Sequence, residues 1–305
     1  MDPYILGQQL INGLTLGSIY GLIAVGYTMV YGIIGMINFA HGDVYMISAY
    51  ISAIVLAVVA YFGIDSIAFA LLLTLIVTMV MTGFYGWCIE RTVYRPLGGT
   101  SRLAPLISAI GVSLVLQNYM QLSQGPNVQG VPAMITGNLR IGGAEHFIQV
   151  KYMSLVIIAV SVLAMLLLTW FVQGTSLGRQ CRATQQDRRM ATILGIDTAR
   201  VISLVFVIGS VMAAIAGVLV TQNYGSFDFF IGFIIGIKAF SAAVLGGIGS
   251  LPGAMLGGLV LGCLESLFSG LVSSDYKDVF SFGVLVLVLI FKPSGLLGRP
   301  AVEKV

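Results

Sequence analysis

The sequence predicts an all-α, polytopic membrane protein, a transmembrane helical bundle of eight to nine crossings with some helices broken by glycine and proline. Of the 305 residues, 58% are hydrophobic and only 9% are charged, whereas about a quarter of the residues in soluble domains are charged. The apolar residues form long runs, not the alternating segments of ~10 residues that a membrane β-barrel needs. These observations exclude a water-soluble globule and a barrel. The net charge of +3 does not indicate nucleic-acid binding, since nearly all basic residues lie between apolar runs.

Long apolar runs divide the chain into crossings. A helix rises ~1.5 Å per residue and the bilayer core is ~30 Å thick, so one crossing needs about 20 residues. The first run follows no basic n-region and no cleavage site, and we expect it to remain in the mature protein. The runs cover residues 5–37, 44–62, 67–89, 104–122, 153–172, 201–223 and 229–272, and a last run starts near Val279.

The run at residues 229–272 is too long for one helix. It would extend roughly 66 Å, about twice the thickness of the bilayer core. Glycine weakens a helix and proline cannot donate a helical hydrogen bond. We therefore expect a turn or an unwound segment at Gly246, Gly247, Gly249 and Pro252.

Basic residues set the orientation, because cytoplasmic loops are enriched in lysine and arginine. Three clusters are expected on the cytoplasmic side, and the C-terminus is expected there with them. The loop at residues 123–150 carries turn signals and reads as an irregular external loop. The three clusters are Arg91, Arg95 and Arg102; Arg179, Arg182, Arg188, Arg189 and Arg200; and Lys292, Arg299 and Lys304.

The cytoplasmic loop at residues 174–200 has a pattern that a plain connecting loop does not need. Small and apolar residues recur every three or four positions, which favours a short helix with an apolar stripe beside a basic face, ended by Gly195. Such a helix would dock on another surface, and the alternative is a solvated loop that only sets topology. The stripe consists of Ala183, Asp187, Met190, Ala191 and Leu194.

The stretch at residues 38–43 fits a helix break beside a pathway. Asn38, His41 and Asp43 would be costly facing lipid, and at membrane depth they should face protein or a wet cavity. The alternative is a cytoplasmic turn that contacts only solvent. Gly35-Met36-Ile37 and Gly42 match Gly246-Gly247-Ile248 and Gly253 at the same spacing. Transporters often build sites from two such breaks in repeated halves.

Two charged residues, Lys238 and Glu265, lie inside the run at residues 229–272. If the run turns back near Leu251, the two lie at similar depth, because they are thirteen and fourteen residues from the turn. A buried pair costs less than two lone charges. We therefore expect a structural or gating ion pair, the alternatives being a snorkelling lysine and a glutamate that faces a partner subunit.

Small residues also occur at helical spacing in two runs. Gly13, Gly17 and Gly21 form one such series, and the other comprises Gly253, Gly257, Gly258 and Gly262. Small residues four apart let helix backbones approach closely in membranes. We expect both series to pack helices rather than to touch a substrate.

The sequence lacks two motifs that would indicate nucleotide binding or zinc-dependent hydrolysis. The chain has no Gly-Lys dipeptide and so no P-loop, and it has no HExxH motif. The three cysteines, Cys88, Cys181 and Cys263, lack the spacing of a metal site or a disulfide framework. We expect no catalytic residue, no metal and no cofactor bound by this chain, and any driving energy must come from another subunit.

Four segments resemble the permeases of bacterial branched-chain amino-acid ABC importers. They are residues 13–43, which include Asn38-Phe39-Ala40-His41-Gly42-Asp43; residues 242–254; the cytoplasmic loop from Arg182 to Ile196; and residues 296–305. The likeness therefore runs from end to end of the chain. It implies a single transmembrane permease domain over residues 1–305 in the bacterial inner membrane.

The resemblance also implies partners and site residues. In that family a second, homologous permease pairs with the first, two cytoplasmic ATPases use ATP and magnesium, and a periplasmic binding protein delivers leucine, isoleucine or valine. The loop at residues 123–150 would then receive the binding protein. The coupling segment that enters an ATPase groove would comprise Arg182, Ala183, Asp187, Arg188, Met190, Ala191, Leu194 and Gly195, and the pathway breaks would comprise Asn38, Phe39, His41, Asp43, Gly246, Gly247, Gly249 and Pro252.

Two alternatives remain at this level. One is a permease of the same family for urea, short amides or other amino acids, since relatives share the run from Asn38 to Gly42. The other is an ion-coupled secondary transporter that works without ATPases. The docking-type loop and the few intramembrane carboxylates argue against it.

Overall fold

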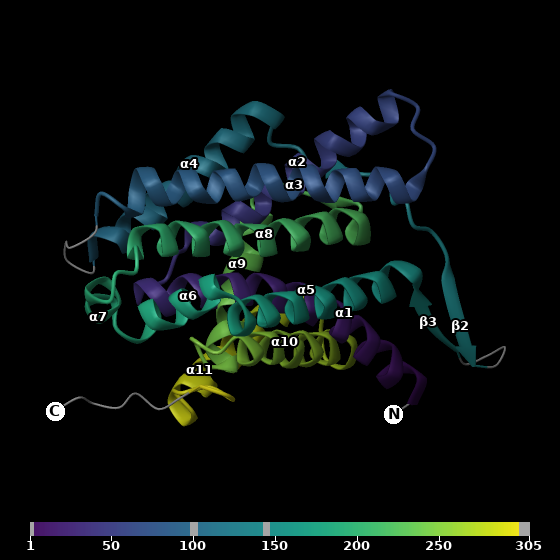
Figure 1. Cartoon of the computed structure of the whole chain (residues 1–305). Coiled ribbons are helices and arrows are strands. Elements are labelled where there is room, and N and C mark those ends of the chain that lie inside the picture. Colours follow the sequence, from purple (N-terminus) through teal and green to yellow (C-terminus); the bar gives the residue numbers. More distant parts are fainter. Residues whose placement is uncertain (1–2, 98–102, 143–146, 299–305) are drawn as a thin grey trace.

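The computed structural model describes residues 3–97, 103–142 and 147–298, and it is a helical bundle (Figure 1). Arg102, Arg299 and Lys304, which the orientation argument used, lie outside the described residues. The helices are α1 (Pro3–Ile34), α2 (Ala40–Tyr61), α3 (Ile67–Ile89) with the π-helical turn η1 (Glu90–Tyr94), α4 (Leu103–Gln124), α5 (Tyr152–Gly174), α6 (Ser176–Gln186), α7 (Arg188–Ile193), α8 (Thr198–Tyr224), α9 (Ile231–Gly246), α10 (Leu251–Leu271) and α11 (Lys277–Phe291).

Seven helices among the described residues are long and apolar enough to cross a bilayer: α1, α2, α3 with η1, α4, α5, α8 and α10. The shorter α9 is also apolar, and α11 has 15 residues. The expected eight to nine crossings thus divide into seven full-length helices and these two short ones. The long run at residues 229–272 does turn back, because α9 ends at Gly246 and α10 begins at Leu251.

The bundle has a buried interior and an apolar exterior. In α1 and α8, 78% and 72% of the spanning window is buried, against 22–28% in α3, α4 and α5. Figure 1 shows α8 and α1 between α3 on one side and α10 on the other. The outer helices present leucine, isoleucine, valine and phenylalanine outward, as a surface in contact with lipid or a partner subunit would.

Glycine permits the close contact between α1 and α10. A Cβ atom at Gly262 would lie 2.3 Å from the backbone nitrogen of Gly17, and one at Gly258 would lie 2.4 Å from that of Gly21. No side chain fits at these distances. The two glycine series therefore face each other across an antiparallel seam, as the spacing predicted.

Short strands lie at the end of the bundle where the N-terminus is seen (Figure 1). β2 (Asn138–Gly142) pairs antiparallel with β3 (Phe147–Lys151), and β1 (Gln129–Gly130) pairs antiparallel with β4 (Ser226–Phe227). The irregular loop expected at residues 123–150 is corrected accordingly. Gln8 of α1 holds the β2–β3 hairpin through hydrogen bonds with the backbone of Gln149.

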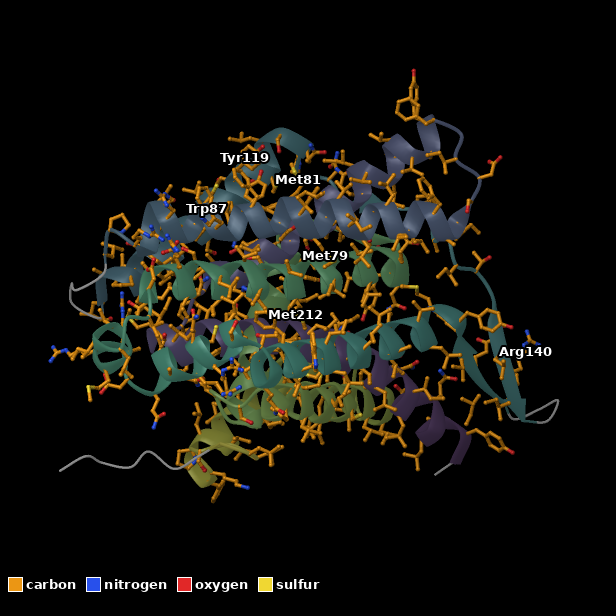
Figure 2. The ribbon with its side chains drawn as sticks, viewed as in Figure 1. Met79, Met81, Trp87, Tyr119, Arg140 and Met212 are labelled. Carbon is orange, nitrogen blue, oxygen red and sulfur yellow. The ribbon has the colours of Figure 1, made fainter. Side chains whose placement is uncertain are left out.

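The two ends of the bundle differ in charge as the basic clusters predicted. Figure 2 shows Arg140 on the hairpin at one end and Trp87 toward the other end of α3. The guanidinium of Arg91 lies over the Trp87 ring, 5.5 Å from its centroid. The basic segment α6–α7 lies at this same end, opposite the hairpin (Figure 1).

Candidate functional site

The basic segment at residues 174–200 folds as two helices, not the single helix expected from its stripe. Asp187 has extended backbone angles (φ −157°, ψ 108°), so α6 ends at Gln186 and α7 begins at Arg188. The Asp187 carboxylate accepts hydrogen bonds from the backbone N–H groups of Arg189 (2.8 Å) and Met190 (3.0 Å). Aspartate is a strong N-cap because it satisfies amides that the first helical turn leaves free. Asp187, which was expected to belong to the stripe of one helix, is therefore the N-cap that separates α6 from α7.

The surface of α7 and the residue after it combines apolar and basic groups. Met190, Ile193 and Leu194 are 57%, 78% and 77% exposed, and Arg188 and Arg189 are exposed beside them. Among the predicted stripe residues, Ala191 is buried against the bundle and Ala183 is half-buried in α6. Gly195 ends the segment with a φ of +83°. Three exposed apolar side chains on so short a segment suit docking on another protein.

The α6 helix is held against the bundle at its start. The Thr175 hydroxyl caps it by accepting from the Gly178 backbone N–H, at 3.0 Å. The Arg182 guanidinium donates to the Val172 carbonyl near the end of α5. Cys181 is buried, and burial raises the pKa of its thiol. The α6 helix is therefore fastened to the end of α5, and α7 follows it with only Ala191 buried.

The first helix break, residues 35–39, brings polar side chains into the interior. Gly35 ends α1 with a φ of +72°, and α2 begins at Ala40. The Tyr94 hydroxyl donates to Asn38 Oδ1 at 2.8 Å, and Gln117 Nε2 donates to Asp43 Oδ1 at 3.0 Å. The expected alternative of a turn with only solvent contacts is therefore wrong.

Aromatic contacts complete this first break. The His41 ring is 1% exposed and lies edge-on to Tyr27, with ring centroids 4.8 Å apart. Phe39 contacts Phe240 of α9, with centroids 6.2 Å apart. The break is thus packed against α9, the helix that leads to the second break.

The second helix break, residues 247–250, is built from backbone. Gly247 and Gly249 have φ angles of +100° and +98°, which favour glycine. The Ser250 hydroxyl caps α10 by accepting from the Gly253 backbone N–H at 3.2 Å, and Pro252 lies in the first turn of α10. The backbone N–H groups of Leu296 and Leu297 donate to the carbonyls of Leu245 and Gly246, at 2.8 and 2.9 Å.

The two breaks, which the sequence repeat relates, lie close together. Ile37 and Ile248 occupy matching positions in the repeat, and both line one small cavity with Tyr27, Tyr31 and Phe240. Gly42, the repeat partner of Gly253, lies directly on α9, because a Cβ there would meet the Gly232 carbonyl at 2.3 Å. The two helix breaks therefore lie around one small cavity.

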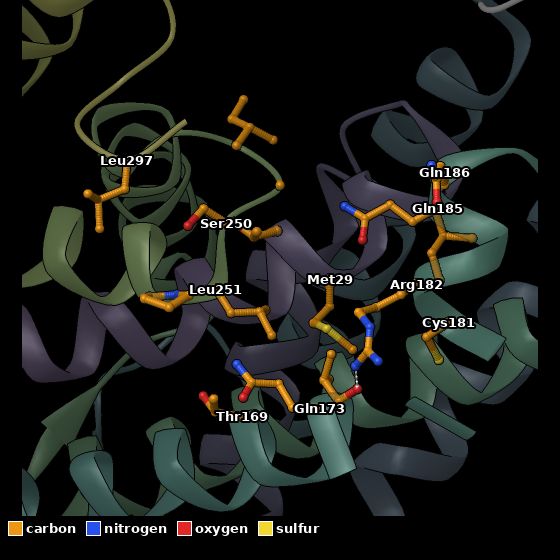
Figure 3. Close-up of a pocket in the computed structure, with 16 residues that line it drawn as sticks. Met29, Thr169, Gln173, Cys181, Arg182, Gln185, Gln186, Ser250, Leu251 and Leu297 are labelled. Carbon is orange, nitrogen blue, oxygen red and sulfur yellow. Dashed lines mark hydrogen bonds between the residues drawn. The ribbon is translucent and has the colours of Figure 1, made fainter. Parts of the chain in front are cut away.

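A larger cavity of about 760 Å³ opens between the second break and α6 (Figure 3). Its lining mixes apolar side chains with amides, hydroxyls and one guanidinium. Figure 3 shows Gln185 and Arg182 reaching in from α6, and Ser250 and Leu251 on the opposite wall. This cavity could not be predicted from the sequence, because its walls come from residues 28–33, 169–186, 248–252 and 297.

Lys238 and Glu265 are in contact in the interior. Lys238 Nζ lies 2.6 Å from Glu265 Oε1, and both side chains are almost completely buried. Lys238 Nζ also lies 2.6 Å from Oδ1 of Asp278 at the start of α11. The Ser281 hydroxyl donates to Glu265 Oε2 at 2.9 Å, and the Tyr20 hydroxyl lies 3.3 Å from both carboxylate oxygens. The pair is surrounded by Asp278, Ser281 and Tyr20, whose places beside it were not predicted from the sequence.

The described residues contain no group of three or more histidine, cysteine, aspartate or glutamate side chains that could hold a metal ion. The arrangement offers a docking surface on α7, two packed helix breaks and an internal ion pair.

Comparison with known proteins gives a consistent result. A family model described as "Branched-chain amino acid transport system / permease component" matches residues 9–289. The chain is 53% identical to the high-affinity branched-chain amino acid transport system permease protein LivH of Salmonella typhimurium over 299 residues, covering 98% of this chain and 97% of LivH. It is 52% identical to the corresponding permease protein BraD of Pseudomonas aeruginosa, with the same coverage. It is also 25% identical to the permease protein LivM of Escherichia coli, covering 97% of this chain and 71% of LivM.

Proposed function

The chain belongs to the family of permease components of branched-chain amino acid transport systems, and from this we propose that it is the membrane permease subunit of an ATP-driven importer of leucine, isoleucine and valine. The observation that carries the substrate assignment is the 53% identity to LivH over nearly the whole length of both chains. The alignment covers 98% of this chain, so it extends over the segments that carry the helix breaks and the α6–α7 helices.

Four partners complete the proposed importer. A second, homologous permease fits the likeness to both LivH and LivM, two relatives that are each named as permease proteins of such a system. Two ATPase subunits that use ATP and magnesium would dock on α7, where three apolar side chains and two arginines are exposed. A periplasmic binding protein would deliver the amino acid to the end of the bundle that carries the β2–β3 hairpin.

The proposed location follows from the same features. Seven helices can span a bilayer, and we place the protein in the bacterial inner membrane. The α6–α7 segment and the C-terminus would face the cytoplasm, in agreement with the basic residues on that segment.

The task of this subunit would be mechanical. ATP binding by the docked ATPases would displace α7, and the bundle would pass between outward-open and inward-open forms. Two packed helix breaks suit such a change, because buried packing tends to switch between discrete arrangements and not to deform continuously. Residues of this chain would conduct the amino acid without forming a bond to it.

Uptake by reconstituted vesicles tests the proposal. The chain, its partner permease and the ATPases are reconstituted in lipid vesicles. ATP is enclosed with the ATPases inside the vesicles, and the binding protein and amino acid are added outside. We expect uptake of radiolabelled leucine, isoleucine and valine that requires ATP and the binding protein. ATP-dependent uptake of urea or acetamide instead would identify the chain as a permease of the same family for a different substrate.

The chain alone is the control for a different class of transporter. We expect vesicles that contain only this subunit to show no leucine uptake under a proton or sodium gradient. Gradient-driven uptake by the chain alone would contradict the proposal and identify a secondary transporter.

A further inference from the structure

Gln185 is the second-to-last residue of α6 and lies two positions before the cap that starts α7. Its side chain extends into the larger cavity, toward the wall that carries Ser250 and Leu251 (Figure 3). A displacement of α7 would reach Gln185 through Asp187 and Gln186, the two residues that separate it from α7. Gln185 thus stands where the docking surface joins the membrane bundle.

The amide of Gln185 lies near the end of α1 that precedes the first helix break and near the second helix break. A Cβ atom at Gly32 would lie 2.8 Å from Gln185 Nε2, and one at Gly249 would lie 3.7 Å from the same atom. Gly32 is in the last turn of α1, three residues before Gly35, and Gly249 lies within residues 247–250. One side chain of the docking segment therefore lies between the end of α1 and the second helix break.

Glycine makes this contact possible. A side chain at Gly32 would occupy the position that the Gln185 amide now fills. At Gly249 the φ of +98° also favours glycine for the backbone alone. Gln185 is exposed and lines the cavity, so any link between α7 and the breaks would act through the steric position of its amide beside Gly32 and Gly249.

We propose that Gln185 is a positioning residue that links the movement of α7 to both helix breaks, so that the two breaks change together when the motor subunits move. The proposal rests on the proposed function, because it needs a motor that displaces α7. It goes beyond that function by assigning the link to one side chain and its two glycine neighbours. Gln185 acts through the breaks and has no contact with substrate in this account.

The ratio of leucine imported to ATP hydrolysed tests the link in vesicles with the complete complex. We expect Gln185→Ala to lower this ratio roughly three- to thirty-fold, the range for residues that carry coupling between sites, while ATP hydrolysis continues. Gln185→Met keeps the length of the side chain and should restore most of the ratio. A purely structural role would lower assembly and hydrolysis together and leave the ratio unchanged.

Gln186→Ala is the matched control. Gln186 lies on the same helix and lines the same cavity, but it is not among the nearest neighbours of Gly32 or Gly249. Its ratio should stay at the wild-type value. Equal ratios for Gln185→Ala and Gln186→Ala would overturn the proposal.

Gly32→Ala provides an independent test that keeps Gln185. The new methyl group must displace the Gln185 amide, so we expect a lower ratio, and Gln185→Ala with Gly32→Ala should be no worse than Gln185→Ala alone. Independent effects that multiply would overturn the link, as would a wild-type ratio for Gly32→Ala if Gln185→Ala fails to assemble. Failure of the proposed function is distinguished because the wild-type complex would then import no leucine at all.

Discussion

The Lys238 cluster and the α7 surface use charge in opposite ways. In the cluster, a lysine lies 2.6 Å from each of two carboxylates, and two hydroxyls approach Glu265 from α1 and α11. On α7, Arg188 and Arg189 are exposed beside Met190, Ile193 and Leu194. The cluster joins four helices of one chain, whereas the apolar and basic side chains of the α7 surface are exposed.

The contrast separates residues that hold the bundle together from residues that connect it to a motor. Removing one partner of a buried charge leaves the other uncompensated, so substitutions in the cluster should lower stability. Exposed side chains contribute little to stability, so substitutions on α7 should leave the fold intact and affect only transport. The predictions below test this separation in order of decreasing effect on the free energy of unfolding.

Lys238→Met should have the largest effect. It leaves Glu265 buried without its cation, and we expect a loss of about 3–5 kcal/mol in the free energy of unfolding. Denaturant or thermal unfolding of the purified protein in detergent measures it. A loss below about 1 kcal/mol would place the cluster on the same level as a surface ion pair.

The double variant Lys238→Met with Glu265→Gln is the control for pairing. It removes both charges of the pair, and we expect it to recover much of the stability that Lys238→Met loses, because exchange of a buried pair for neutral groups is often close to neutral. A double variant as unstable as the sum of the two single ones would argue against a paired role.

Gly262→Leu should have the next largest effect. Its Cβ would meet the backbone of Gly17 at 2.3 Å, and backbone cannot move aside as a flexible side chain can. Overpacking of this kind costs about 1–3 kcal/mol, and we expect a value near the upper end. Gly111→Ala on the outer helix α4 is the control, since no atom lies within 4 Å of its Cβ position. Equal unfolding midpoints for the two variants would contradict the tight seam.

Tyr94→Phe tests the first helix break with a smaller change. It removes the hydroxyl that donates to buried Asn38, and we expect a loss of about 1 kcal/mol. The same unfolding measurement detects it. Unchanged stability would mean that Asn38 finds another donor and that the break does not depend on η1.

Ile193→Asp should have the smallest effect on stability and a large one on transport. Ile193 is 78% exposed, so we expect the free energy of unfolding to change by less than about 0.5 kcal/mol. ATP-dependent leucine uptake should fall strongly, because a carboxylate would enter the proposed docking interface. A stable Ile193→Asp protein with full uptake would remove α7 from the motor interface.

Most of the helical framework follows from hydrophobic runs alone. The run predicted at residues 67–89 has the same bounds as α3. The turn expected at Gly246, Gly247, Gly249 and Pro252 lies where α9 ends and α10 begins. The hairpin of β2 and β3 was missed, because only five residues in each strand pair and turn signals dominate that segment.

Contacts between distant segments limit what the sequence can predict about the site. The similar depth of Lys238 and Glu265 predicted their contact. Asp278 joins them only because the chain returns after residues 272–276 and α11 packs against α9 and α10. The division of the docking segment could have been seen in advance, because Asp187 before Arg188-Arg189-Met190 is an N-cap signal. The approach of Gln185 to Gly32 and Gly249, which are more than 200 residues apart in the chain, has no local signal in the sequence.

The accessibility of position 193 shows whether α7 is the surface on which the ATPase subunits dock. In an Ile193→Cys variant, the new thiol is exposed, whereas native Cys181 is buried and the raised pKa of its thiol keeps it protonated and slow to react at neutral pH. We expect a maleimide to label the variant rapidly when the permease is alone and slowly when the ATPase subunits are bound. Equally rapid labelling in the assembled, ATP-hydrolysing complex would contradict the assignment of α7 as the surface that receives the motor.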